Sequence, residues 1–238
     1  VREAVPMGRS VHDYDDAPHL VEAFPFERAN DRFERFDAAF ADHFGEHVDP
    51  IEFEFDGYDG DYFEALCDRV LADQRQGMDH VIESAGTLGG GNHFVEFARG
   101  RESGDYWLVV HSGSRYLGLS VAEYWQERAS DLRDADHMRD QIDDGDRKYL
   151  QFDPDEVTPT ELFTWVTGGM GESHIDADAV RADFDGKDIE HTFDRLNAMD
   201  PTGTDRNEEL DWLEGREAHG YLVDMLFAQQ YARWNREL

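Results

Sequence analysis

Lysine is almost absent from this chain of 238 residues, and basic residues of any kind are scarce. The lysines are Lys148 and Lys187; lysine and arginine together number 22 against 55 aspartates and glutamates, a formal net charge of -33. At molar salt the Debye length is about 3 Å, so the self-repulsion of such a chain is screened. The composition therefore predicts a halophilic protein. It argues against a general affinity for nucleic acids, although a local arginine cluster can still bind phosphate.

Cysteine occurs once, as Cys67, so no disulfide can form within the chain, and we expect a reducing, cytoplasmic location. The apolar residues around Cys67 have helical spacing, which favours a buried structural thiol over a metal ligand or nucleophile. No apolar run approaches 18 residues, so we expect no membrane span, no membrane partner and no signal peptide. Hydrophobic residues make up 39% of the chain and aromatic residues 13%, which is enough to build a folded core.

The spacing of apolar residues predicts a mixture of helices and strands. Apolar runs at 93–98 and 106–111 predict two strands joined by a polar turn around 100–104. Helices are expected over about 60–76, 117–132 and 210–238. Another helix is expected from a cap at Asp31, with four phenylalanines on one face: Phe33, Phe36, Phe40 and Phe44. In the last helix five residues fall near one face: Leu222, Met225, Leu226, Gln229 and Ala232. This pattern predicts an α/β (α+β) fold with mixed sheets and flanking helices.

Residues 134–215 differ in composition from the rest of the chain. They are rich in aspartate, glutamate, glycine and threonine, with short helical patterns near 176–184 and 188–198. We interpret this segment as a partly exposed acidic insertion without a second core, carried by a single domain that spans residues 1–238.

A glycine-rich segment precedes the first predicted strand, and a segment of small residues follows the second. The first reads Gly86-Thr87-Leu88-Gly89-Gly90-Gly91-Asn92-His93-Phe94-Val95-Glu96, and the second reads Val110-His111-Ser112-Gly113-Ser114-Arg115. Glycine lets a backbone approach a ligand closely. His93 and His111 are 18 residues apart, enough for a strand, a turn and a second strand. We therefore expect both imidazoles at the same region of a sheet.

His93 and His111 are candidate metal ligands, because neutral imidazole suits Mn, Zn, Fe or Ni. Two histidines do not complete a metal site, and each could instead be a hydrogen-bonded structural residue. Glu96 could accept from a guanine edge or a ribose hydroxyl, or remain a solvated strand glutamate. Along a regular strand Asn92 and Glu96 would face one way and His93 the other.

Ser112, Ser114 and Arg115 form a candidate phosphate site just before a predicted helix. Backbone amides at a helix start favour anions, and arginine adds a bidentate phosphate donor. A structural helix cap with a surface arginine is the alternative. The other histidines considered are expected at the surface or at helix caps: His43, His47, His137, His174 and His191.

Together these segments resemble the RtcB-type RNA-splicing ligases, enzymes that use GTP to join an RNA 3′-phosphate or 2′,3′-cyclic phosphate end to a 5′-hydroxyl end. Two further segments are similar to the family: Arg2-Glu3-Ala4-Val5-Pro6 with Gly8, and Tyr221-Leu222-Val223-Asp224-Met225 through Ala228, Tyr231-Ala232 and Asn235-Arg236. Four matches in order are far more specific than a lone glycine loop. They imply the central portion of an RtcB-like domain, with no match in 134–215.

The resemblance implies two Mn²⁺ ions and GTP as cofactors, with RNA (tRNA halves or broken RNA) as the partner in tRNA splicing or RNA repair. It implies that His93 binds one metal and His111 the other, beside a family histidine that becomes linked to GMP. The GMP then passes to the RNA 3′-phosphate, and the 5′-hydroxyl displaces it. The remaining residues matched by motif are Asn92 and Glu96, which with His93 would contact the guanylate, and Ser112, Ser114 and Arg115, which would contact RNA phosphate.

Two segments of the family pattern do not occur in the 238 residues. These are a metal-binding Asp-x-Gly-Cys-Gly and the His-Gly-Ala-Gly-Arg that carries the guanylylated histidine. We therefore expect an incomplete chain that holds about half of the active site and none of the covalent catalysis. The alternatives are a non-catalytic metal- or RNA-binding relative or gene remnant, and an unrelated halophilic metal-binding protein. The RNA substrate, the oligomeric state and any protein activator stay open.

Overall fold

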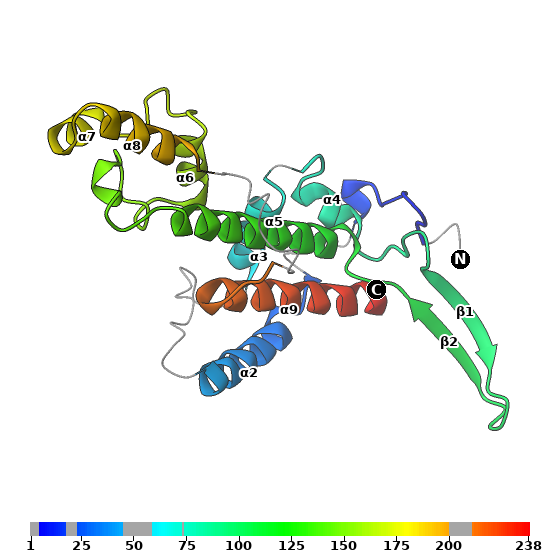
Figure 1. Ribbon diagram of the computed structural model, residues 1–238. Coiled ribbons are helices and arrows are strands. Elements are labelled where there is room, and N and C mark those ends of the chain that lie inside the picture. The colour runs from blue at the N-terminus through cyan, green and yellow to red at the C-terminus, as the bar shows by residue number, and fades with distance from the viewer. Residues whose placement is uncertain (1–4, 18–22, 45–58, 73, 200–210) are drawn as a thin grey trace. The chain divides into compact units, whose positions relative to one another are not determined.

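The computed structural model describes residues 5–17, 23–44, 59–72, 74–199 and 211–238, which form two compact units (Figure 1). The first unit comprises Val1–Trp125 and Leu213–Leu238, and the second comprises Gln126–Trp212. The boundary between them lies within helix α5 (Arg115–Asp140). Each unit has a hydrophobic core of its own.

The first unit combines helices with a two-stranded ribbon, which confirms the predicted mixture of helix and strand. Its helices include the following: η1 (Tyr14–Asp16), α2 (Phe26–Phe44), α3 (Gly60–Val70), α4 (Met78–Glu83), the first part of α5, and α9 (Gly215–Glu237). Strands β1 (Phe94–Arg99) and β2 (Tyr106–His111) form the antiparallel ribbon, within one residue of the predicted bounds.

Helix α9 lies at the centre of the first core. The ring of Phe227 is fully buried and stacks with Phe63 at 5.7 Å and with Phe33 at 6.2 Å, both centroid distances. The helix buries a stripe that includes polar residues: His219, Gly220, Val223, Asp224, Phe227, Ala228, Gln230, Tyr231, Trp234 and Asn235. The face proposed from the sequence is not this one, since Leu222 and Gln229 are exposed. Spacing of apolar residues alone misplaced the face because carboxylate and amide side chains lie on the buried side.

Asp224 is a buried carboxylate on this helix that accepts several hydrogen bonds. Its carboxylate accepts from the Tyr62 hydroxyl at 2.7 Å, from the Trp125 indole N–H at 2.7 Å, and from the Arg69 guanidinium at 2.7 and 2.8 Å. A buried carboxylate is stable only when its oxygens are paired in this way. Asp224 therefore ties α3 and α5 to α9.

The ends of the helices follow from local hydrogen bonds. Helix α2 begins before the cap expected at Asp31, because the carbonyl of Pro25 already accepts from the N–H of Ala29 at 3.1 Å. Helix α3 begins where expected, after Asp59, whose carboxylate accepts from the N–H groups of Asp61 and Tyr62. It ends at Val70, well before residue 76, and α4 was not predicted.

The predicted apolar face of α2 and the predicted burial of Cys67 are both confirmed. Phe33 and Phe40 are buried, and Phe36 packs against the core, whereas the side chain of Phe44 lies outside what the structure describes. The Cys67 side chain is 1% exposed, and burial, with added effects of Asp68 and Glu64, raises the pKa of its thiol to about 12. A thiol in this state is a poor nucleophile and a poor metal ligand.

The ribbon extends away from the helices of its unit (Figure 1). Phe94 lies opposite His111 in the register, and every residue of β2 is exposed. Its side chains are nonetheless largely apolar, with Phe97 71% and Leu108 67% exposed. Among the described residues no helix is long and apolar enough to cross a membrane.

The second unit contains the remainder of α5, η3 (Arg147–Tyr149), α6 (Pro159–Val166), α7 (Ala177–Asp183) and α8 (Lys187–Asn197). The two short helices near 176–184 and 188–198 are confirmed, and α6 was not predicted. The expectation that this segment lacks a core is wrong, because a buried cluster includes Ile142, Tyr149, Ile175, Val180 and Leu196. The assignment of residues 1–238 to a single domain with an insertion stays a prediction.

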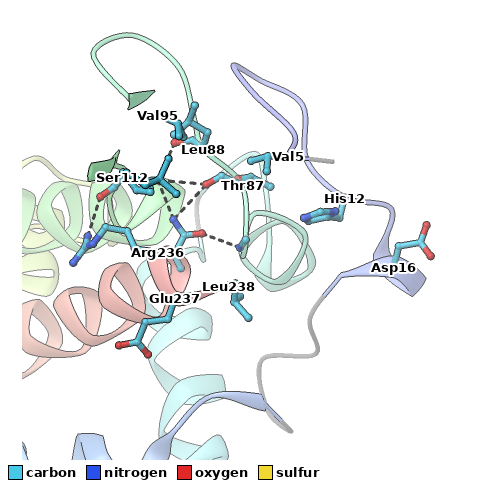
Figure 2. A pocket seen from close by; sticks show the side chains of 14 residues that line it. Val5, His12, Asp16, Thr87, Leu88, Val95, Ser112, Arg236, Glu237 and Leu238 are labelled. Atoms are coloured by element: carbon cyan, nitrogen blue, oxygen red, sulfur yellow. Dashed lines mark hydrogen bonds between the residues drawn. The ribbon is translucent and has the colours of Figure 1, made fainter. Parts of the chain in front are cut away.

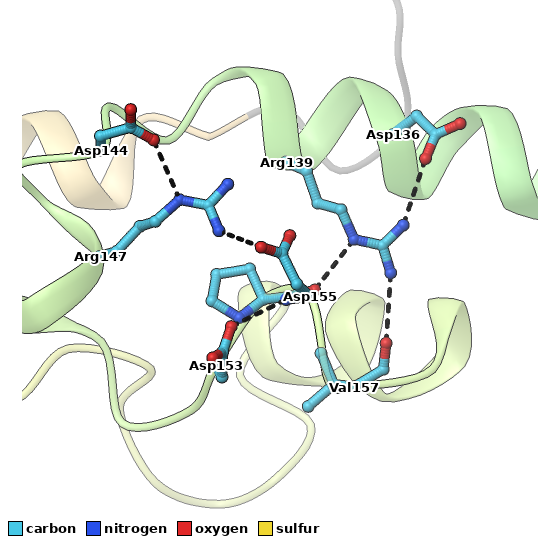
Figure 3. Close-up of polar contacts among 8 residues, drawn as sticks. Asp136, Arg139, Asp144, Arg147, Asp153, Asp155 and Val157 are labelled. Carbon is cyan, nitrogen blue, oxygen red and sulfur yellow. Dashed lines mark hydrogen bonds and ion pairs between the residues drawn. The ribbon is translucent and has the colours of Figure 1, made fainter.

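Arginines hold the loop that precedes α6, as Figure 3 shows. Arg139 donates to the carbonyls of Pro154 and Val157 at 2.9 and 3.2 Å, and Arg147 donates to the carboxylate of Asp155 at 2.6 Å. His174, expected at the surface, is instead buried in this unit and lies 2.9 Å from the Leu196 carbonyl. A histidine with one satisfied ring nitrogen can occupy a core, which spacing alone does not reveal.

Some residues singled out in the sequence lie outside the described ranges. They are Arg2, Glu3 and Ala4 of the first family-like segment, and His47.

Candidate functional site

The two sequence segments that carry the candidate residues meet at the base of the ribbon. His93 comes directly before β1, and His111 is the last residue of β2. Their ring centroids are 5.9 Å apart, with 38° between the ring planes. The expectation that both imidazoles reach the same region of a sheet is confirmed.

The register places His111 directly opposite Phe94, and their rings stack at 5.2 Å between centroids. Residues opposite each other in an antiparallel pair point to the same face, so His111 shares a face with Phe94 and Glu96. His93 lies outside the regular strand, which lets its ring approach His111 although strict alternation would separate them. Asn92 and Glu96 are both exposed on the same stretch of chain.

Gly89 makes the space in which His93 and Arg115 meet. This glycine has a φ of +93°, and a Cβ there would lie 2.3 Å from the His93 Nδ1 and 1.9 Å from an Arg115 guanidinium nitrogen. With any other residue at this position the two side chains would have to shift, and the positive φ also favours glycine. The nearby Gly90 packs against the first segment, where a Cβ would lie 3.2 Å from the Gly8 Cα.

The His93 ring is held without a hydrogen bond to its inner nitrogen. Among the described residues its Nδ1 is buried and has no hydrogen-bond partner. Burial, followed by the positive charge of Arg115 and the neighbouring His111, lowers the pKa of the His93 imidazole. A neutral imidazole is the form that binds a metal ion.

Arg115 begins α5 in a strained backbone conformation. Its φ of +54° is the one positive value among the described non-glycine residues. The side chain turns back to donate from Nε to the hydroxyl of Thr87 at 3.0 Å, and that hydroxyl donates to the Ser84 carbonyl at 2.6 Å. Burial lowers the pKa of the Arg115 guanidinium. Such strain tends to be found at functional sites, where the surrounding structure enforces it.

The two serines of the second segment, Ser112 and Ser114, have different contacts. The Ser112 hydroxyl donates to the carbonyl of Leu88 at 2.8 Å, so it joins the two segments to each other. Ser114 is half-buried beside Gly118, where a Cβ would lie 1.9 Å from the Ser114 Oγ. Ser112 is therefore occupied by internal hydrogen bonds, whereas Arg115 is oriented by one.

Asn235 of α9 is a positioning residue to which the sequence assigned no role. Its side-chain oxygen accepts from the Gly86 N–H at 2.8 Å, and its amide group donates to the Ser112 hydroxyl at 3.0 Å and to the Gly113 carbonyl at 3.2 Å. The neighbouring Arg236 donates to the Ser112 carbonyl at 2.9 Å. The signal was present in the sequence, because this dipeptide belongs to the fourth family-like segment.

The first family-like segment also reaches the loop. The Leu88 N–H donates to the Pro6 carbonyl at 3.0 Å, and the Gly8 N–H donates to the Gly89 carbonyl at 2.8 Å. All four segments recognised in the sequence therefore meet around the glycine loop, as far as their residues are described.

A pocket of about 640 Å³ opens on one side of this meeting point. Figure 2 shows Thr87, Leu88 and Ser112 close together on one side of it, with His12 and Asp16 on the other. The ribbon adds apolar side chains, among them Val95, to its lining. Neither His93 nor His111 lines this pocket.

The donor chemistry of the histidine pair suits a transition metal, since each ring can supply one neutral nitrogen. The partnerless Nδ1 of His93 is consistent with a polar group that meets a ligand. Within the described ranges, however, no group of three or more histidine, cysteine, aspartate or glutamate side chains is arranged to hold a metal ion. The pair therefore fits part of a metal site, and Cys67 does not contribute to it.

Comparison with known proteins identifies related sequences. The family model described as tRNA-splicing ligase RtcB matches residues 34–158, a little more than half of the chain. The RNA-splicing ligase RtcB of Escherichia coli K12 is 46% identical over 44 residues, which are 18% of this chain and 10% of that protein. RNA-splicing ligase RtcB1 of another Escherichia coli strain matches with the same identity and the same coverage. The matched part of the chain thus spans about a tenth of the length of these relatives. No solved structure matches.

Proposed function

This chain belongs to the RtcB family of tRNA-splicing ligases, and we propose that it is part of an enzyme that joins RNA 3′-phosphate or 2′,3′-cyclic phosphate ends to 5′-hydroxyl ends in tRNA splicing or RNA repair. One observation carries the proposal: His93 and His111, from two separate family-like segments, bring their rings to 5.9 Å of each other. The family match spans both residues.

We propose that His93 supplies a nitrogen ligand to one Mn²⁺ ion and His111 to a second. The bound ions would stabilise negative charge on the reacting phosphates. The protein's own contribution is positional. Gly89 leaves room for the His93 ring, and the stack with Phe94 holds the ring of His111. A ligand held in advance binds metal with a smaller entropy loss.

Asn92 and Glu96 are proposed, with His93, to contact the guanylate of GTP. Their exposure leaves their polar groups accessible to a nucleotide. Glu96 shares a ribbon face with His111, so a nucleotide held by Glu96 would lie on the side of the ribbon that carries the second proposed metal ligand.

Arg115, with Ser112 and Ser114, is proposed to contact RNA phosphate. The fixed orientation of Arg115 supports a contact to phosphate, since its Nε is already bonded to Thr87 and one terminal nitrogen lies beside Gly89. Ser112 would act mainly by holding the loop, because its hydroxyl donates to Leu88.

The 238 residues lack the family's Asp-x-Gly-Cys-Gly and His-Gly-Ala-Gly-Arg segments. We propose that this polypeptide by itself does not ligate RNA, because neither the full metal ligand set nor the guanylylated histidine is present. Sealing of RNA ends by these residues with GTP and Mn²⁺ in molar KCl would refute this. A non-catalytic relative that binds metal or RNA is the second candidate, and substituted metal ligands in the flanking sequence would favour it. Ligation restored by a polypeptide supplying those segments would rule it out.

Composition supports two further parts of the proposal. A net charge of -33 with two lysines fits a halophilic protein, and a single cysteine fits the cytoplasm.

Metal binding gives a direct test of the proposed site. Mn²⁺ affinity would be measured by electron paramagnetic resonance of the free ion, for the unchanged chain, His93→Ala and His111→Ala. Each substitution is expected to weaken binding at least about tenfold, because it removes a ligand. His191→Ala, at an exposed position on α8, is the matched control and should bind as the unchanged chain does. Equal Mn²⁺ affinity in all four proteins would contradict the proposed roles.

A further inference from the structure

A second pocket, of about 580 Å³, adjoins the start of α5 in the first unit. Three arginines line it, Arg9, Arg75 and Arg115, together with His80. No aspartate or glutamate is among its lining residues. In a protein with 55 acidic residues against 22 basic ones, a pocket whose charged lining residues are all arginines departs sharply from the average surface.

The three arginines are not used in ion pairs within the described part of the chain. Arginines elsewhere, such as Arg28 with Glu237 and Arg195 with Asp146, pair with a carboxylate. For Arg9, Arg75 and Arg115 no carboxylate partner is found among the described residues. The carboxylate of Glu83 lies 3.8 Å from the ring of His80 and is not part of the pocket lining. The pocket therefore has uncompensated positive charge.

Arg115 gives this charge a fixed position. Its backbone is strained, its Nε is held by Thr87, and its guanidinium occupies the space that Gly89 leaves open. A half-buried guanidinium without a counter-charge has lost part of its hydration, and an anion that enters the pocket would restore favourable interactions. The strain and the desolvation both favour a site built for an anion over a surface arginine with no role.

The position of the pocket indicates which anion it binds. Arg115 borders Gly89 on the same side as the His93 Nδ1, yet neither His93 nor His111 lines the pocket. An anion here would lie near the proposed reaction centre and still be separate from it. A nucleic acid strand carries a phosphate at every nucleotide, so a strand with its end at the histidine pair would place a neighbouring phosphate close by.

We propose that Arg9 and Arg75 join Arg115 to bind an internal phosphodiester group of the RNA strand in this pocket. The inference rests on the proposed function for the choice of RNA. It adds two phosphate-binding residues and a subsite apart from the reacting ends. Arginine suits this task because its planar guanidinium binds phosphate oxygens in pairs and stays charged.

The test measures binding of a short, fluorescein-labelled single-stranded RNA with a 5′-hydroxyl end, by fluorescence anisotropy over a series of KCl concentrations. Arg9→Gln and Arg75→Gln are each expected to weaken binding about tenfold and to reduce the salt slope by about 1, since each removes one phosphate contact. Both side chains are exposed, so the fold should be kept. Arg101→Gln, at an exposed position in the ribbon turn, makes the same change in net charge and should bind as the unchanged chain does.

The results that would overturn this inference differ from those that would contradict the proposed metal ligands. RNA affinity and salt slope unchanged in the Arg9→Gln, Arg75→Gln double variant would overturn the inference, even if the histidine variants lose Mn²⁺. Loss of RNA affinity in the arginine variants would support it, even if the histidine variants keep Mn²⁺. Inorganic phosphate serves as a further probe: binding of phosphate without any binding of RNA would also overturn the inference, because the ligand would then be a free oxyanion.

Discussion

The side-chain oxygen of Asn235 accepts a hydrogen bond from the backbone N–H of Gly86 at 2.8 Å, joining the end of α9 to the start of the glycine loop. The amide group of the same residue donates to the segment that follows β2. One buried side chain thereby fixes the distance between the two loops that carry His93 and His111. An unpaired buried polar group is costly, so these bonds stabilise the observed arrangement of the loops.

Replacing Asn235 by alanine should therefore destabilise the protein. The change leaves the Gly86 N–H and the Gly113 carbonyl without their partner, and we expect the free energy of unfolding to fall by about 1–3 kcal/mol. Urea unfolding in molar KCl measures it. Gln229→Ala, on the exposed face of the same helix, should change the value by less than about 0.5 kcal/mol. Equal stability of the two variants would show that the bonds to Asn235 contribute nothing.

Gly89→Ala should disturb the site more than the fold. A Cβ would overlap the Arg115 guanidinium and the His93 ring, and a φ of +93° is strained for alanine. We expect weaker binding of Mn²⁺ and of RNA together, because both side chains must move. Gly145→Ala, where a Cβ would meet nothing within 4 Å, is the control and should leave both affinities unchanged. Normal affinity for both ligands in Gly89→Ala would argue against a shared position beside Gly89.

Asp224→Ala should be among the most damaging substitutions in the first unit. It removes the carboxylate shared by Tyr62, Trp125 and Arg69 and leaves the donors unpaired. Loss of one partner of a fully buried ion pair costs about 3–5 kcal/mol; we expect about 2–4 kcal/mol here, because the Arg69 side chain is 36% exposed. Thermal and urea unfolding give the measurement. Glu123→Ala, which removes an exposed carboxylate from α5, should be nearly neutral.

The buried thiol of Cys67 should make the protein less stable at alkaline pH. Burial raises the pKa of its thiol from 9.0 to about 12 in the folded protein, so the unfolded chain loses this proton first as pH rises. The contribution of the thiol to the free energy of unfolding is therefore constant below pH 9. It declines between pH 9 and about 12, with a slope that approaches about 1.4 kcal/mol per pH unit. The difference between the unchanged protein and Cys67→Ala, followed by urea unfolding over this range, isolates the thiol. A difference that does not vary with pH would contradict the assignment.

Salt should stabilise the protein throughout the range up to molar KCl. The net charge of -33 repels itself in dilute buffer, and added salt screens that repulsion. We expect the Tm to rise steadily with KCl, and to rise similarly with NaCl, because screening depends on ionic strength. A Tm that is highest in dilute buffer would show that the acidic surface is not an adaptation to salt.

The sequence by itself determined the local features. Two apolar runs and the polar turn between them set the two strands to within one residue, and the phenylalanine spacing gave the buried face of α2. The four family-like segments are short sequence motifs, and they identified the family that the comparison supports. The spacing of His93 and His111 also predicted that their side chains lie close together, because the two ends of a β-hairpin lie side by side.

The tertiary structure decided what depends on partners distant in sequence. The buried face of α9 follows from Asp224 and Asn235, whose polar side chains are stable inside only because donors and acceptors from α3, α5 and the loops meet them. The core of the second unit and the burial of His174 depend in the same way on neighbours that no local pattern names. The pocket of Arg9, Arg75 and Arg115 joins three separate segments, so its charge emerges only when the chain is folded.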